Sequence, residues 1–123
     1  SRFIVGGKSE GVRFSKALTA YLGSWVCYYV LQFPLRDFSY CFRMFSRRVI
    51  ETFKIESSEG FTIVVEYTVK AHRKNFNLIE LAGQHIERTK GKSKFKLLKW
   101  VPKYLRWVMY LMITNVNKIF KNV

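Results

Sequence analysis

The segment Glu87-Arg88-Thr89-Lys90-Gly91-Lys92-Ser93-Lys94 carries four cations within eight residues. Gly91 permits backbone angles that other residues resist, so this basic loop can bend tightly. A tight bend would turn Arg88, Lys94, the Ser93 hydroxyl and backbone N–H groups toward one centre, and a phosphate group prefers such donors. We therefore predict phosphate binding by the basic loop. A solvent-exposed charge run is the alternative.

The composition is compatible with this prediction. The chain has 123 residues, of which 49% are hydrophobic and 24% charged, and this is typical of a globular domain with a modest core. A net charge of +14 indicates a phosphate-bearing partner, namely nucleic acid, anionic lipid or a phosphorylated substrate. The aromatic content of 17% favours contact with a membrane or a partner.

Groups that often carry catalysis or bind metals are sparse in the sequence. Cys27 and Cys41 form no disulfide framework and have no metal-binding spacing, so we expect buried thiols in a reducing compartment. His72 and His85 are isolated from other candidate ligands. The sequence offers no Ser/His/Asp or Cys/His arrangement and no Walker-type glycine loop. We therefore expect no metal ligands in this chain.

Hydrophobic periodicity and turn residues predict a mixed α/β fold. Ser46 is expected to cap a short helix. Pro102 is expected to mark either a kink or a fresh start in the last helix. The predicted strands are residues 2–5, 37–45 and 75–86, and the predicted helices are residues 12–35, 47–53, 61–74 and 96–123.

The segment from Ala17 to Leu35 contains no charged residue and approaches the length of a membrane span. Gly23 and Pro34, together with three tyrosines, favour a buried or an interfacial helix instead. The sequence leaves all three possibilities open.

The C-terminal segment predicts an amphipathic helix over residues 96–123. Cations and apolar residues each recur every three or four positions, on different faces. From Ile86 to the end there are ten Lys and Arg residues and one acid, Glu87. We predict a helix lying on an anionic membrane, with Trp100, Tyr104 and Trp107 at the interface. Packing against its own domain is the alternative.

Several motifs follow one another in a recognisable order. They are Ser1-Arg2-Phe3, Gly6-Gly7, Asp37-Phe38-Ser39-Tyr40-Cys41-Phe42-Arg43, Gly60-Phe61 with Glu66, Glu80-Leu81-Ala82 and the basic loop. The set resembles the C-terminal half of the catalytic domain of polyprenyl-phosphate glycosyltransferases, which include the dolichol-phosphate mannose synthases. The resemblance covers roughly residues 1–95. Cys41 stands where the family has glycine, and Ala82 where it has proline.

The resemblance implies a GT-A type fold, an open α/β sheet, for the domain to which residues 1–95 would belong. It implies transfer of a hexose, most commonly mannose, from a nucleotide-sugar donor to a membrane-embedded polyprenyl phosphate at the cytoplasmic face of a membrane. It also implies a divalent metal, Mg or Mn, with ligands outside this chain. The nucleotide-binding half is expected before Ser1, so these residues alone are expected to be inactive.

The same resemblance assigns roles to individual residues. Arg2, Arg88 and Asp37 are the predicted catalytic residues, and Arg2, Arg88, Ser93 and Lys94 are the predicted phosphate-binding residues. An ionised acceptor phosphate needs cations more than a strong base, which agrees with this set. For Asp37 a structural role in its turn remains the alternative.

Two other classes of function compete with the transferase. A small basic nucleic-acid-binding module would explain the charge and the aromatic residues. Against it, the aromatic residues cluster in long apolar runs rather than alternating with cations, so we expect no nucleic-acid partner. A structural membrane-peripheral domain would leave the ordered motifs unexplained.

Overall fold

A computed structural model of the chain describes the backbone of residues 1–87 and 97–121, and the side chains of residues 1–87 and 101–114. The chain forms two compact units, each built from two separate segments. Unit 1 comprises Ser1–Tyr40 and Leu78–Phe95, and unit 2 comprises Cys41–Asn77 and Lys96–Val123.

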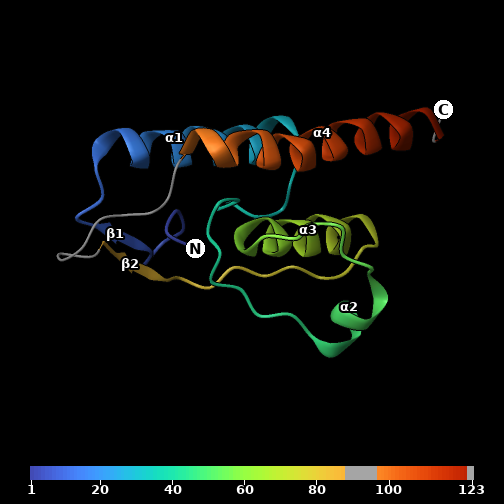
Figure 1. Ribbon diagram of the computed structural model, residues 1–123, viewed down its shortest axis with the longest axis horizontal. Helices are drawn as coiled ribbons and strands as arrows, with labels where there is room; N and C mark the ends of the chain where they lie inside the picture. Colours follow the sequence, from blue (N-terminus) through green and yellow to red (C-terminus); the bar gives the residue numbers. More distant parts are fainter. Residues whose placement is uncertain (88–96, 122–123) are drawn as a thin grey trace. The chain divides into compact units, whose positions relative to one another are not determined.

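Unit 1 contains a two-stranded parallel sheet and a long helix (Figure 1). Strand β1 (Lys8–Glu10) pairs with strand β2 (Gln84–Ile86), and Ser9 lies opposite His85. Helix α1 (Phe14–Trp25) continues directly into the π-helical segment η1 (Val26–Val30). The prediction of a helix here is confirmed, with an end at Val30 rather than Leu35.

A tight turn replaces the strand predicted over residues 2–5, so that prediction is wrong. The backbone N–H of Gly7 donates to the carbonyl of Ile4 at 2.9 Å, and Gly6 has a φ of 86°. A Cβ atom at Gly7 would lie 2.6 Å from the carbonyl oxygen of Ser1. The paired glycine therefore lets the chain fold back closely on Ser1 and Arg2.

After η1 the chain becomes extended, since Gln32 has a φ of 51° and Pro34 follows. Alternate side chains are buried from this point, namely Leu31, Phe33, Leu35 and Asp37. The rings of Phe33 and Phe38 meet edge to face at 5.3 Å. Among the residues that the structure describes, no helix has the length and apolar character needed to cross a bilayer.

Unit 2 consists of helices α2 (Arg47–Thr52), α3 (Gly60–Arg73) and α4 (Leu97–Lys121). Helix α3 packs against α4 (Figure 1) and buries Val65 and Val69. These three helices confirm the predicted ones. Pro102 lies inside α4, so it does not mark the start of that helix.

The Ser46 cap is confirmed, because its hydroxyl accepts the backbone N–H of Val49 at 3.4 Å. We predict that Ser46→Ala lowers the free energy of unfolding by about 0.5–1 kcal/mol, since an orphan N–H loses its partner. Ser46→Gly should lower the free energy of unfolding by only about 0.3 kcal/mol. Urea unfolding followed by circular dichroism measures both, and equal losses would contradict the capping role.

The strand predicted over residues 37–45 is wrong. Side chains do alternate there: Phe42 and Met44 are 90% and 97% exposed, whereas Phe45 packs on Tyr67 at 5.2 Å. Among the described residues this segment pairs with no strand. An alternating pattern predicts an extended backbone, but a ladder also requires a neighbouring strand.

Only the end of the strand predicted over residues 75–86 forms, as β2. The preceding helix α3 ends in a Schellman motif, in which Asn75 has a φ of 58° and Phe76 donates its N–H to the carbonyl of Ala71 at 3.0 Å. The described chain is thus a mixture of helices with a small parallel sheet, which confirms the α/β class at this coarse level.

Candidate functional site

Arg2 and Asp37, 35 positions apart, form a bidentate ion pair in unit 1. The Arg2 Nε donates to Asp37 Oδ2 and its Nη2 to Oδ1, both at 2.8 Å. The backbone N–H of Arg2 adds a third bond to Oδ2 at 3.0 Å. The exposed fractions of the two side chains are 11% for Arg2 and 1% for Asp37. The structure therefore brings two predicted catalytic residues together in a largely buried pair.

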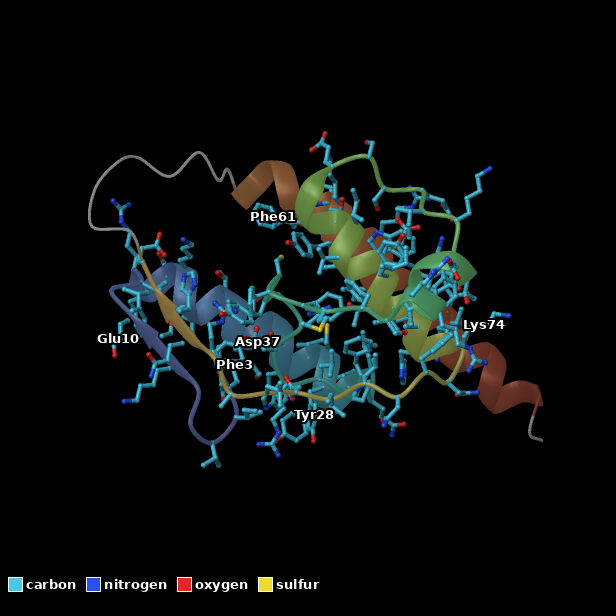
Figure 2. The ribbon with its side chains drawn as sticks, turned by 90° about the horizontal axis from the view of Figure 1, so that it is seen from below. Phe3, Glu10, Tyr28, Asp37, Phe61 and Lys74 are labelled. Atoms are coloured by element: carbon cyan, nitrogen blue, oxygen red, sulfur yellow. The ribbon has the colours of Figure 1, made fainter. Side chains whose placement is uncertain are left out.

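Further contacts hold the Arg2 guanidinium in place. Its Nη2 also donates to the Ser39 hydroxyl at 2.9 Å. The guanidinium carbon lies 5.0 Å from the ring centre of Phe3 and 5.1 Å from that of Tyr40, within cation–π range. Figure 2 shows Phe3 and Asp37 next to each other in unit 1. The charge of Arg2 is thus fixed in position by one carboxylate, one hydroxyl and two rings.

A third motif, around Glu80, meets the same cluster. The Glu80 carboxylate accepts the backbone N–H of Arg36 at 2.9 Å and that of Asp37 at 3.1 Å. The backbone nitrogen of Ser1 donates to the carbonyl of Leu81 at 2.6 Å. The Ser1-Arg2-Phe3, Asp37 and Glu80 motifs therefore converge in unit 1, although they are far apart in the sequence.

The ionisation of Asp37 follows from these contacts. Burial by itself raises the pKa of the Asp37 carboxyl. The hydrogen bonds and the charge of Arg2 lower the pKa by a larger amount, so it lies below its ordinary value. Asp37 is therefore ionised at neutral pH. Both of its carboxylate oxygens bind Arg2, so in this structure it positions that guanidinium.

Glu87, the first residue of the basic loop, is bound by helix α1 and by strand β1. The Glu87 carboxylate accepts the Lys16 ammonium from α1 at 2.8 and 3.0 Å, and its backbone N–H donates to the carbonyl of Glu10 at 3.0 Å. The hydrogen bond from Lys16 is the main cause that lowers the pKa of Glu87. Arg88, Ser93 and Lys94 lie outside the described residues, so their roles stay predictions.

Two of the three residues predicted at a membrane interface face the interior of unit 2, which corrects that prediction. Trp107 is 3% exposed, and its Nε1 donates to the Ser57 hydroxyl at 3.3 Å. Tyr104 is half-buried, with its hydroxyl 4.0 Å from Cys41 Sγ, and burial raises its pKa. The side chain of Trp100 lies outside the described residues.

Unit 2 also contains a buried polar cluster around Glu66. The Glu66 side chain is fully buried and accepts the backbone N–H groups of Glu56 and Ser57 at 2.8 and 2.7 Å. Lys70 Nζ lies 2.7 Å from Glu66 Oε1 and 3.2 Å from Glu56 Oε1. The i,i+4 spacing of Glu66 and Lys70 on a predicted helix was the signal that could have identified this pair.

Cys27 is buried as expected, and burial raises the pKa of its thiol to about 12. Cys41 is half-buried. Among the described residues no group of three His, Cys, Asp or Glu side chains gathers that could hold a metal ion. The resemblance places the ligands of its divalent metal outside this chain, so that metal stays a prediction and we derive no step through it.

Comparisons with models of known families, with curated proteins and with solved structures found no match. The likeness to polyprenyl-phosphate glycosyltransferases thus rests on the ordered motifs in the sequence. The GT-A fold and the family itself stay predictions.

Proposed function

We propose that this chain is part of a glycosyltransferase at the cytoplasmic face of a membrane. The enzyme moves a hexose, which we take to be mannose, from a nucleotide-sugar to a polyprenyl phosphate. The observation that carries the proposal is the convergence of three motif segments in unit 1. Arg2, Asp37 and Glu80 belong to different motifs, and their groups form one hydrogen-bonded cluster. A shared hydrogen-bonded cluster gives a physical reason why these three motifs are present together in one sequence.

The chemistry of such a transfer suits the cations of this chain. A phosphate oxygen of the acceptor attacks the anomeric carbon of the sugar, and the bond from that carbon to the nucleoside diphosphate breaks with inversion. The diphosphate leaves with the bonding electron pair. The acceptor is already an anion, so the chain has to hold it and to offset the negative charge on the leaving group. We assign this work to the basic loop and to Arg2, whose guanidinium is positioned by Asp37.

Binding of a short prenyl phosphate tests the proposal. We expect farnesyl phosphate to bind the chain, and farnesol, which lacks the phosphate, to bind more weakly. The double variant R88A/K94A should weaken binding of the phosphate by roughly tenfold or more, since charge-assisted hydrogen bonds are lost. The measurement is broadening of the phosphorus NMR signal during titration.

The control variant R47A/K54A removes the same two residue types from exposed positions outside the basic loop. It should bind farnesyl phosphate like the unchanged chain. Equal affinity of the basic-loop variant and this control would contradict the assignment. Sugar transfer by the 123-residue chain alone would contradict the expectation that the donor-binding half lies elsewhere.

Duplex DNA is the competing ligand, because the net charge of +14 would attract any polyphosphate. A salt titration against duplex DNA and against vesicles containing phosphatidylglycerol separates the two classes. Steep salt-dependent binding to DNA without binding to vesicles would favour the nucleic-acid module over the transferase.

A further inference from the structure

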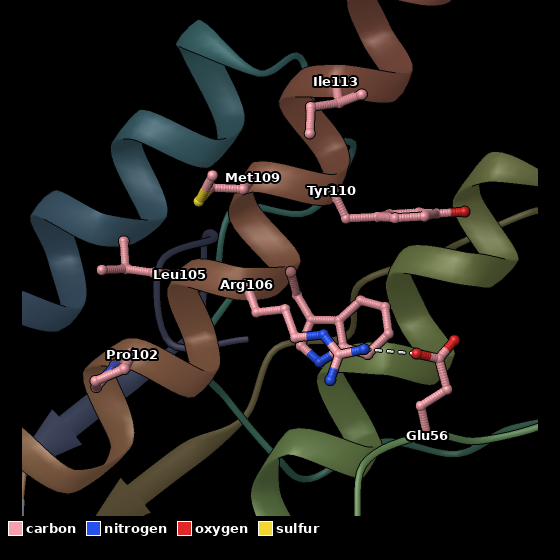
Figure 3. Close-up of a pocket in the computed structure, with 8 residues that line it drawn as sticks. Glu56, Pro102, Leu105, Arg106, Met109, Tyr110 and Ile113 are labelled. Atoms are coloured by element: carbon pink, nitrogen blue, oxygen red, sulfur yellow. Dashed lines mark hydrogen bonds and ion pairs between the residues drawn. The ribbon is translucent and has the colours of Figure 1, made fainter.

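One face of α4 exposes an apolar ridge along the helix. It comprises Val101, Leu105, Met109, Met112 and Ile113, whose exposed fractions are 39%, 51%, 57%, 49% and 57%. These residues recur at spacings of three and four, so they share one side of the helix. In Figure 3, Leu105 and Met109 project from one side of α4, and Tyr110 and Arg106 from the side of α3 and Glu56.

Contacts on the opposite face fix this orientation within unit 2. Trp107 and Leu111 are buried, with exposed fractions of 3% and 0%. Lys103 forms an ion pair with Glu59 at 2.6 Å, and Arg106 forms one with Glu56, also at 2.6 Å. Rotation of α4 to hide the ridge would expose the two buried side chains and separate both ion pairs. The ridge is therefore a stable feature of unit 2.

The charges of the same part of the chain indicate what covers the ridge. From Arg88 to Val123 the sequence contains ten Lys and Arg residues and no acid. A lipid bilayer with anionic headgroups offers an apolar layer and negative charge within a few ångströms of each other, which this combination requires. Duplex nucleic acid would satisfy the cations and would leave the apolar ridge in water.

We propose that the apolar ridge of α4 is the surface by which this chain lies on an anionic bilayer. Leu105 and Met109 enter the boundary between headgroups and acyl chains, and the excess of positive charge between Arg88 and Val123 attracts this part of the chain to the anionic surface. This surface replaces Trp107 and Tyr104 as the membrane-facing side of the helix. The proposal does not depend on the transferase activity, because it rests on exposure and charge alone.

Flotation of the complete chain with vesicles tests the proposal. We expect the chain to float with vesicles of phosphatidylcholine mixed with phosphatidylglycerol, and much less with phosphatidylcholine alone. The variant L105E/M109E should bind the anionic vesicles at least roughly tenfold more weakly, because each substitution places a carboxylate where apolar surface would be buried. The unchanged chain and the variant are compared at equal lipid concentration.

The matched control is L81E/M44E, which makes the same two substitutions at positions that are 75% and 97% exposed and lie outside α4. It should float like the unchanged chain. Equal flotation of the ridge variant and this control would overturn the proposal. A lower melting temperature of the ridge variant alone would also overturn it, because the ridge would then be covered by protein. Equal binding to neutral and anionic vesicles would overturn the role of the cations.

Discussion

Replacing Asp37 with alanine should lower the free energy of unfolding by about 3–5 kcal/mol, because it removes one partner of a largely buried ion pair. The Arg2 side chain is only 11% exposed, so its charge would stay in a poorly solvated place without the Asp37 carboxylate that binds it. The backbone N–H of Arg2 would also lose its acceptor. Urea unfolding followed by circular dichroism measures the loss.

The contribution of Asp37 should depend on pH in a defined direction. Its folded-state pKa lies below its ordinary value, because the bonds from Arg2 outweigh the effect of burial. The stabilisation is therefore fully present above the unfolded-state pKa of about 3.9 and is lost as the pH falls through the lower folded-state value. The difference between the unchanged chain and Asp37→Ala should be constant near neutral pH and shrink below about pH 4.

A double variant serves as the control for this prediction. R2M/D37L removes both charges and keeps apolar volume, so it should recover much of the stability that Asp37→Ala loses. A double variant as unstable as Asp37→Ala would show that the pair itself is not the cause. An unchanged stability of Asp37→Ala would contradict the buried pair altogether.

The second large effect is expected at Glu66. Glu66→Ala should cost about 3–5 kcal/mol of unfolding free energy, since it leaves Lys70 and two backbone N–H groups without their buried acceptor. The amides of Glu56 and Ser57 should then exchange with solvent hydrogen faster, because they donate to this carboxylate. Urea unfolding and amide hydrogen exchange measure the two effects.

Glu51→Ala is the matched control, because it removes a glutamate that pairs with Arg47 at the surface of α2. The exposed fractions of Arg47 and Glu51 are 90% and 60%, so this pair should contribute less than about 0.5 kcal/mol. Equal losses of stability in the two alanine variants would contradict the role of Glu66 as a buried acceptor for Lys70 and two backbone N–H groups.

Local signals in the sequence predicted the helices well. The Ser46 cap lies next to the helix that it starts, and the periodic apolar residues of α3 and α4 lie within those helices. Each of these signals extends over only a few residues, so it can be recognised in the sequence without knowledge of the rest of the fold. The strands failed because alternation at Phe42 and Met44 indicates an extended backbone, whereas a strand also needs a partner that local sequence does not supply.

The candidate site shows the same division. The motifs predicted catalytic roles for Arg2 and Asp37, but not that the two side chains bind each other. They are 35 positions apart in the sequence, and only the fold brings them together. The side of α4 that faces outward was also misjudged. Apolar and aromatic residues surround much of this helix, so the ring of Trp107 suited either face, and only the contacts with Ser57 and α3 decide which one is buried.

The interleaved construction of the two units has a consequence for synthesis. Strand β1 leaves the ribosome long before β2, its partner, and the whole of Cys41–Asn77 is made between them. Unit 1 therefore cannot close until its second segment emerges, and in the meantime the aromatic side of α1 has no finished domain around it. A nascent chain of this kind would depend on chaperones, or on early contact with a lipid surface, to keep those rings from aggregating.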